Sequence, residues 1–253
     1  MPVVSIANQK GGVSKTTTTQ ALVTLFNQKG KKSLAVDLDP QGNLSFAMGA
    51  EIEGAPTIYN ALKGEVGVAE ILQSTPSGDI LPANILLSGA DTEFTSTGRE
   101  YMLKETISEI VKDYDHVFID CPPALSILTI NAFVASSSIV IPAAADVFSL
   151  QGMAQLAGTI QRVKKYCNSS LAVAGVLLTR FNPRTKLSSH IQQMLEGITA
   201  NMDTVLFSTV IRSSITVQET QYRRRNLLEY DGGSNANLDY RNFVRELEAI
   251  LDA

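Results

Sequence analysis

The sequence has few of the features that mark secreted or membrane proteins. Its 253 residues include only two cysteines, Cys121 and Cys167, which are too few for a disulfide framework and lack the spacing of metal ligands. No charged and apolar leader opens the chain, and no apolar run approaches the length of a membrane span. These absences argue against secretion and membrane insertion, and we expect a cytoplasmic protein with free thiols.

Aromatic residues are also scarce, at 6%, whereas hydrophobic residues as a whole make up 44% of the chain. A chain of this length and composition can bury one large α/β core. We therefore expect residues 1–253 to form one domain, although length alone also allows two small ones.

The net charge of −4 argues against a generally basic nucleic-acid-binding protein, but it hides an asymmetry. Residues 1–126 carry 9 basic and 15 acidic residues, whereas residues 127–253 carry 12 basic and 10 acidic ones. A local basic face can bind a phosphate backbone on an acidic protein, because salt screens charges more than about 10 Å away. The basic clusters of the second half are either such a face or ordinary solvated helix surfaces.

Short, nearly continuous apolar runs alternate with longer segments of helical spacing. The apolar runs suit strands buried on both faces of a parallel sheet and lie at 2–7, 32–39, 116–121, 137–143, 171–179 and 204–211. The helical segments lie at 16–29, 57–73, 99–113, 125–135, 150–166 and 187–200, and residues 74–98 are expected to form a loop with one short strand at 78–84. This order predicts a doubly wound α/β fold, with a mostly parallel sheet flanked by helices and ligands at the carboxyl ends of the strands.

The stretch SIANQKGGVSKTTTT, residues 5–19, lies between a predicted strand and a predicted helix, as a phosphate-binding loop does. It departs from the usual pattern G-x-x-x-x-G-K-[ST], because Gln9 and Ser14 occupy the glycine positions. Lys10 is an additional cation that the usual pattern does not contain. The stretch is therefore either a damaged nucleotide site or a variant with another task.

The loop retains the groups that bind phosphate. Backbone N–H groups of residues 11–16 can converge on phosphate oxygens at the N-terminus of the following helix. Lys15 would then neutralise the β and γ phosphates, and the Thr16 hydroxyl would bind Mg²⁺. Gly11 and Gly12 leave room for another group to approach closely.

Three aspartates at predicted strand ends complete the set needed for nucleotide hydrolysis. Asp120 ends the apolar strand HVFID, where a Walker B carboxylate holds Mg²⁺ through its water shell. Asp37 and Asp39 end the second strand in AVDLDPQGN, and alternation places them on the same side of the sheet. A carboxylate there can orient attacking water or accept a proton from it. Each aspartate alone could be an ordinary turn residue, but their combination with the loop favours a hydrolytic site.

Several motifs in a fixed order make the chain resemble the ParA family of partition ATPases, which are relatives of MinD. KGGVSKTTT matches the deviant Walker A pattern K-G-G-x-x-K-[ST] and is followed by VDLDPQGN, FIDCPPALSILTINA and IVIPAAADVFSLQGMAQL. The resemblance continues through VLLTRFNPRT and STVIRSSITVQE, and so covers nearly the whole chain. It implies a P-loop NTPase of the deviant Walker A class that hydrolyses ATP with Mg²⁺, slowly and under stimulation by a partner.

The resemblance also assigns roles at the nucleotide. The residues that it implies for nucleotide binding are Lys10, Gly11, Gly12, Val13, Ser14, Lys15, Thr16 and Thr17. Lys15 would bind the phosphates of its own subunit, whereas Lys10 would reach across a face-to-face homodimer to the partner's ATP. A cation supplied by the partner would couple dimerisation to hydrolysis. Asp39 would position the attacking water, with Asp37 supporting the Mg²⁺ site and Asp120 holding the metal through water.

In this family the ATP-bound dimer binds DNA without sequence preference, and a ParB-like centromere-binding protein triggers hydrolysis and release. The resemblance therefore implies a chromosome or plasmid segregation ATPase that is cytoplasmic and associates with the nucleoid when it holds ATP. Residue 1 is not preceded by a DNA-binding extension, so we expect no N-terminal helix-turn-helix.

The DNA face is less clearly indicated than the nucleotide loop. Arg184, in NPRT, matches a family position implicated in DNA contact, but Thr216 occupies the next expected basic position. The remaining basic candidates for this face are Lys186, Arg212, Arg223, Arg224 and Arg225.

Three other functions stay open. A MinD-like membrane-associated positioning ATPase would have a basic amphipathic C-terminal helix, whereas Glu246, Glu248 and Asp252 give an acidic character here, and we expect no stable membrane association. A relative of the nitrogenase iron protein would need two cysteines per subunit for a shared cluster, and Cys121 and Cys167 lie in different regions. A ParA-like ATPase that positions protein cargo would have the same fold and site.

Overall fold

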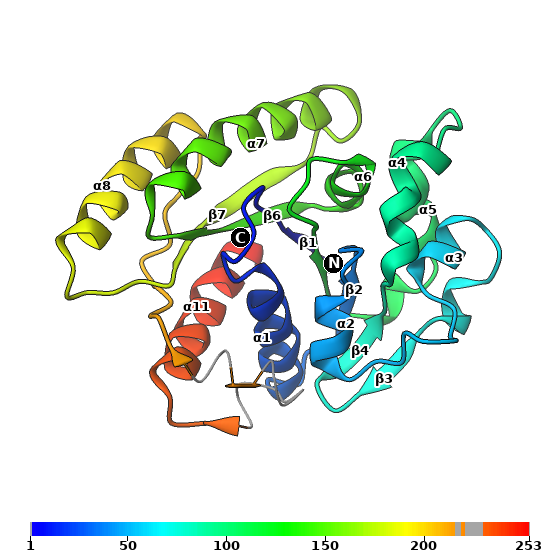
Figure 1. Cartoon of the computed structure of the whole chain (residues 1–253), viewed down its shortest axis with the longest axis horizontal. Helices are drawn as coiled ribbons and strands as arrows, with labels where there is room; N and C mark the ends of the chain where they lie inside the picture. The colour runs from blue at the N-terminus through cyan, green and yellow to red at the C-terminus, as the bar shows by residue number, and fades with distance from the viewer. Residues whose placement is uncertain (1, 216–218, 221–229, 253) are drawn as a thin grey trace.

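The computed structural model describes residues 2–215, 219–220 and 230–252. Its centre is a seven-stranded sheet in the order β3-β4-β2-β5-β1-β6-β7, in which every pairing is parallel except that of β3 with β4. The strands are β1 (Val3–Ile6), β2 (Ser33–Asp37), β3 (Gln73–Thr75), β4 (Gly78–Leu81), β5 (His116–Asp120), β6 (Ser138–Ala144) and β7 (Ala172–Thr179). The predicted doubly wound, mostly parallel α/β fold is confirmed (Figure 1).

Helices cover both faces of this sheet (Figure 1). One face carries α1 (Lys15–Gln28), α2 (Asn43–Met48) and α11 (Asn235–Leu251). The other carries α3 (Ile58–Leu62), α4 (Ala90–Glu93), α5 (Met102–Ile107), α6 (Ile127–Ala135), α7 (Val147–Tyr166) and α8 (Lys186–Asn201). Short 3-10 turns are η1 (Val68–Glu70), η2 (Ile85–Gly89), η3 (Arg99–Tyr101) and η4 (Val111–Asp113).

Alternation of side chains along the strands builds two hydrophobic cores. On β1, Val3 packs into the core that α6 and α7 cover, whereas Val4 and Ile6 pack into the core that α1 and α11 cover. Both faces of the strand are thus buried, and this explains why the apolar runs in the sequence are continuous rather than alternating.

Residues 204–211 do not form the predicted strand. Their backbone meets β7 at an isolated bridge between Leu206 and Val176, and again where the N–H of Ile211 donates to the carbonyl of Leu178 at 2.8 Å. A continuous ladder is interrupted because the N–H groups of Ser208 and Thr209 donate to the carboxylate of Glu246 on α11, at 2.7 and 3.0 Å.

Two predicted helices are shorter than expected. The segment 57–73 is divided into α3 and η1, because Gly64 adopts a left-handed φ of +72° just after α3 ends. The segment 99–113 is divided into η3, α5 and η4. In the segment 74–98, β4 confirms the short strand expected at 78–84, and the rest has more structure than predicted, since it contains η2, α4 and the end of β3.

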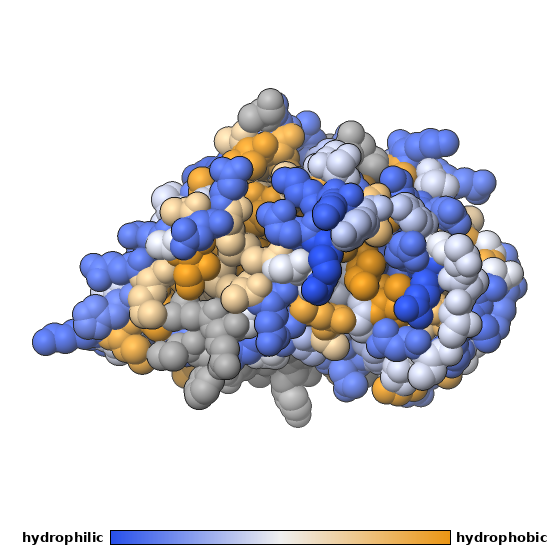
Figure 2. All heavy atoms as spheres, turned by 90° about the horizontal axis from the view of Figure 1, so that it is seen from above, coloured by the Kyte–Doolittle hydropathy of each residue, from blue (hydrophilic) through white to orange (hydrophobic). Residues whose placement is uncertain are grey.

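Hydrophilic residues predominate on the face seen from above Figure 1, where the visible hydrophobic residues form separate patches (Figure 2). Exposed apolar side chains on α8 include Leu187 and Met194. No helix in the described part of the chain has both the length and the apolar character needed to cross a bilayer.

Candidate nucleotide-binding site

A cleft of about 460 Å³ opens where the chain leaves the carboxyl ends of β1, β2 and β5. It is lined by Gly11, Gly12, Ser14, Lys15, Thr16, Thr17, Asp39, Gln41, Asn43, Phe46, Ala47 and Pro123. The lining includes six of the eight loop residues predicted to bind the nucleotide, together with Asp39. The other predicted residues, Lys10, Val13, Asp37 and Asp120, do not line the cleft.

The loop between β1 and α1 contains two residues with a left-handed backbone, of which only the first is glycine. Gly12 has a φ of +73°, and Ser14, at the N-cap of α1, has a φ of +69°. A left-handed conformation costs a residue other than glycine about 1 kcal/mol. The Ser14 side chain makes no capping hydrogen bond. The first N–H groups of α1 are therefore not capped by this side chain and remain suited to an anion in the cleft.

Lys15 is a buried cation at the base of the loop. Its side chain is 8% exposed, and Nζ donates to the carbonyl oxygen of Lys10 at 3.0 Å. Burial lowers the pKa of Lys15, while the nearby Asp120, Cys121 and Asp39 act in the opposite direction. An anionic phosphate next to Nζ would offset the cost of burying this charge.

Thr16 and Asp120 meet on the inner side of the cleft. The Thr16 hydroxyl donates to Oδ2 of Asp120 at 2.7 Å. Oδ1 of Asp120 is buried and has no hydrogen-bond partner among the described residues. Burial, and secondly the neighbouring Asp37, raise the pKa of Asp120 well above its ordinary value. An unsatisfied carboxylate oxygen next to a hydroxyl is a donor set that fits a hard divalent cation such as Mg²⁺.

Asp37 holds the segment that carries Asp39. Oδ1 of Asp37 accepts the N–H of Asp39 at 3.0 Å, and Oδ2 accepts both the N–H and the hydroxyl of Ser45, at 2.8 and 2.7 Å. Complete burial raises the pKa of Asp37 to about 6, against the effect of these hydrogen bonds. Asp39 itself accepts the N–H of Gln41 at 3.0 Å and lines the cleft. The two carboxylates thus differ in position, with Asp37 beneath the segment and Asp39 at the cleft.

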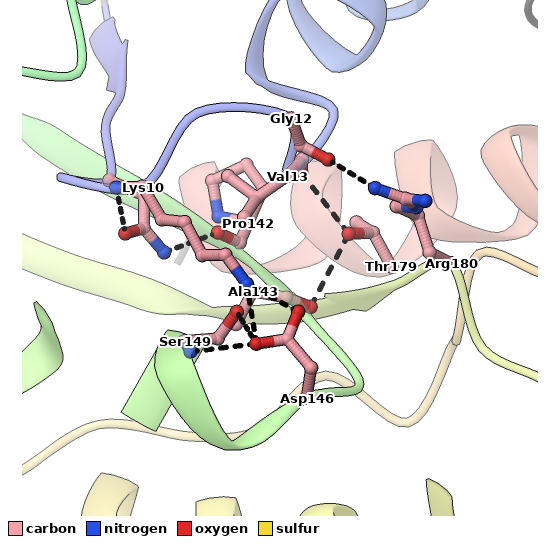
Figure 3. A network of polar contacts seen from close by, with 10 residues as sticks. Lys10, Gly12, Val13, Pro142, Ala143, Asp146, Ser149, Thr179 and Arg180 are labelled. Carbon is pink, nitrogen blue, oxygen red and sulfur yellow. Dashed lines mark hydrogen bonds and ion pairs between the residues drawn. The ribbon is translucent and has the colours of Figure 1, made fainter. Parts of the chain in front are cut away.

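Lys10 does not line the cleft and forms an ion pair with Asp146 (Figure 3). Its Nζ lies 2.5 Å from both carboxylate oxygens, and the two side chains are 29% and 36% exposed. Asp146 is also the N-cap of α7, where Oδ1 accepts the N–H of Ser149 at 3.0 Å. The additional lysine of the loop is therefore held within its own subunit in this structure.

Two further contacts join the loop to the end of β7 (Figure 3). The Thr179 hydroxyl donates to the carbonyl of Val13 at 3.1 Å, and the Arg180 guanidinium donates to the carbonyl of Gly12 at 3.2 Å. Arg180 has a left-handed φ of +52°, which is strained for a residue with a side chain. Sequence reasoning did not select Arg180, because it lies 168 positions from Gly12.

Sequence reasoning also missed five residues that line the cleft after β2 and β5. They are Gln41, Asn43, Phe46, Ala47 and Pro123. The motif DPQGN contained a signal for the first two, since it begins with Asp39 and includes both residues. Gly42 lies between them with a φ of +60°, and a Cβ there would meet the carbonyl oxygen of Ala83 at 3.0 Å, so the turn into α2 requires glycine.

The structure separates the predicted DNA-binding residues. Arg184 is exposed on the loop between β7 and α8, and Lys186 is exposed at the start of α8. Arg212 instead forms a forked ion pair with the buried Asp239 of α11, at 2.6 Å from NH2 to Oδ1. Arg223, Arg224, Arg225 and Thr216 lie outside the described residues.

The chain is similar to known proteins over most of its length. Residues 1–173 match a family model described as an AAA domain. The sporulation initiation inhibitor protein Soj of Bacillus subtilis (strain 168) is 36% identical over 251 residues, which cover 98% of each chain. The chromosome partitioning protein ParA of Caulobacter vibrioides (strain NA1000 / CB15N) is 36% identical over 251 residues, which cover 97% of this chain and 93% of that protein.

A solved structure shares the whole architecture. A protein described as cobyrinic acid a,c-diamide synthase from Mycobacterium smegmatis, crystallised with ADP and magnesium, superposes with a TM-score of 0.87 at 30% sequence identity. The match covers 100% of this chain and 96% of that one.

Proposed function

Since the chain belongs to the ParA family of partition ATPases, we propose that it hydrolyses ATP to drive the segregation of DNA. The observation that carries the proposal is a single cleft that brings together Lys15, Thr16 and Asp39. These are the residue types that bind phosphates, bind Mg²⁺ and position water. The proposal takes residues 1–253 as one ATPase domain, in which α11 packs on α1.

ATP is the substrate that the loop fits. The N–H groups at the start of α1 and the buried Nζ of Lys15 would hold the β and γ phosphates. The Thr16 hydroxyl and Asp120 would hold Mg²⁺, Asp120 through water, and the bound cation would neutralise charge on the phosphates. The unsatisfied Oδ1 of Asp120 supports this assignment.

Asp39 is proposed to position the attacking water, because it lines the same cleft as Lys15 and Thr16 of the loop. Asp37 supports this role indirectly, since both of its oxygens fix the backbone that carries Asp39 and Ser45. Hydrolysis is then slow until a second subunit completes the site.

Lys10 is proposed to contact the ATP of a partner subunit in a homodimer closed over two nucleotides. In one subunit its Nζ pairs with Asp146 and does not reach the cleft. A charge that acts only after dimerisation would stabilise the transferring phosphoryl group and couple assembly to hydrolysis.

The ATP-bound dimer is proposed to bind DNA without sequence preference, and so to associate with the nucleoid. A ParB-like centromere-binding protein would then stimulate hydrolysis and release. Arg184, on the loop before α8, and Lys186, the first residue of α8, are both exposed and are suited to phosphate contacts.

Two substitutions test the proposal. Lys15→Ala should abolish ATP binding and ATP-dependent dimerisation. It should also abolish DNA binding, as measured by fluorescence anisotropy with a duplex at low salt. Asp39→Ala should still bind ATP but hydrolyse it slowly, and should accumulate as a DNA-bound dimer. A wild-type protein that binds no DNA in the presence of ATP would contradict the proposal, and rapid turnover by Asp39→Ala would remove Asp39 from its role.

A further inference from the structure

The carboxylates within α11 have hydrogen-bond or ion-pair partners elsewhere in the fold, although the sequence gives this helix an acidic character. Asp239 is 6% exposed and receives the guanidinium and the N–H of Arg212. Glu246 accepts the N–H groups of Ser208 and Thr209, and Glu248 pairs with Lys29 of α1. Asp252, at the C-cap, lies beyond the last turn.

The arginines of the same helix face outward and have only neutral partners. Arg241 donates to Asn237 at 2.9 Å and to Gln28 at 3.3 Å, and Arg245 donates to Asn242 at 3.4 Å. None of the ion pairs among the described residues involves either arginine. Like charges four residues apart on a helix destabilise it by about 0.2–0.5 kcal/mol, so an anion between them would relieve a repulsion.

Arg241 and Arg245 form the rim of a groove between α1 and α11. We call it the α1/α11 groove. It has a volume of about 260 Å³ and is lined by Leu25, Gln28, Lys29, Arg241, Val244 and Arg245. The Lys29 charge is shared with Glu248, so the two arginines supply the excess positive charge. The groove lies at the C-terminal half of α1, a helix of 14 residues whose first residue is Lys15. At 1.5 Å per residue, its lining is thus roughly 15–20 Å along the helix from the nucleotide loop.

We infer that the α1/α11 groove is a contact surface for the phosphate backbone of DNA. This inference rests on the proposed function and locates its DNA face on elements that were not predicted to take part. Guanidinium groups bind phosphate through paired hydrogen bonds, and those of Arg241 and Arg245 need break only bonds to neutral amides. Arg212, which was predicted for this face, is already engaged by Asp239. A dimer presents the groove twice, which raises avidity for one duplex.

The test compares DNA binding by three full-length proteins loaded with a non-hydrolysable ATP analogue. They are the wild type, Arg241→Ala/Arg245→Ala, and a control, Lys164→Ala/Lys165→Ala, which removes the same charge from the last turn of α7. Each phosphate contact contributes about 0.9 to the slope of log K against log salt concentration. The groove variant should lose about 1.8 of slope for each subunit that contacts the duplex, and more than about tenfold in affinity at low salt. The control should keep a slope close to that of the wild type.

Basal ATPase activity and thermal unfolding should stay unchanged in the groove variant, which separates lost contacts from lost folding. Arg241→Lys/Arg245→Lys keeps the charges and should restore most of the slope. A groove variant with the slope and affinity of the wild type, or a control that loses as much, would overturn the inference while leaving the proposed function intact. A wild type that fails to bind DNA would instead refute the proposed function. Binding of anionic phospholipid vesicles through the groove, with DNA binding unaffected, would also overturn the inference.

Discussion

The ion pair between Lys10 and Asp146 opposes dimerisation if Lys10 has to reach a partner's ATP. Asp146→Asn removes the charge that holds Lys10 and keeps the cap of α7, because asparagine is as good an N-cap as aspartate. We therefore expect this variant to form the ATP-bound dimer more readily than the wild type.

The size of the effect follows from the exposure of the pair. The two side chains are 29% and 36% exposed, so the short contacts are screened by water and the pair contributes about 0.2–1 kcal/mol. A closing dimer breaks one pair in each subunit, which gives about 0.4–2 kcal/mol in total. Since 1.4 kcal/mol corresponds to a factor of ten, Asp146→Asn should tighten dimerisation by roughly 2- to 30-fold.

Analytical ultracentrifugation with a non-hydrolysable ATP analogue measures the dimer dissociation constant directly. A double-mutant cycle with Lys10→Ala shows whether Asp146 acts through Lys10. In the Lys10→Ala background, Asp146→Asn should have no effect on dimerisation. An equal effect in both backgrounds, or a weaker dimer in the single variant, would refute the reasoning. Asp146→Ala also removes the cap and should lower monomer stability by about 0.5–2 kcal/mol, which Asp146→Asn should not.

Two further predictions concern stability. Arg212→Met leaves the buried Asp239 carboxylate without its guanidinium and should lower the free energy of unfolding in urea by about 1–3 kcal/mol. The control, Arg241→Met on the exposed side of α11, should change this free energy by less than about 0.5 kcal/mol. Equal losses in the two variants would contradict the structural role of Arg212. Burial lowers the pKa of His116 below its ordinary value of 6.5, and Lys31 lowers it further. The nearby Asp115, Asp252 and Glu248 raise this pKa but do not outweigh burial. The unfolded chain therefore takes up a proton more readily, so wild-type stability should fall more than that of His116→Phe between about pH 8 and pH 5; parallel curves would contradict this.

The positions of the proposed nucleotide loop and of the aspartates beside it could be predicted from the sequence because their signals are local. A strand, a turn and a helix follow one another within residues 3–28, and Asp37 and Asp120 end strands that become direct neighbours in the sheet. The fold class follows from the alternation of apolar runs and helices.

The features that sequence reasoning missed depend on contacts between distant residues. The pairing of Lys10 with Asp146 spans 136 positions, and nothing near either residue indicates it. The strand expected at 204–211 does not form because a carboxylate on α11 takes two of its N–H groups. The partners of the α11 carboxylates could not be predicted either, because counting charged residues does not reveal which carboxylates have partners inside the fold.

The strands of this protein are synthesised in an order that differs from their order in the sheet. β1 is the first strand to leave the ribosome, yet it lies between β5 and β6, and β5 begins at His116, about 110 residues after Ile6. At 5–20 residues per second, β1 waits roughly 5–20 s for its first hydrogen-bonding neighbour. During this time its apolar residues are exposed on the nascent chain, and transiently exposed hydrophobic surface of this kind favours aggregation.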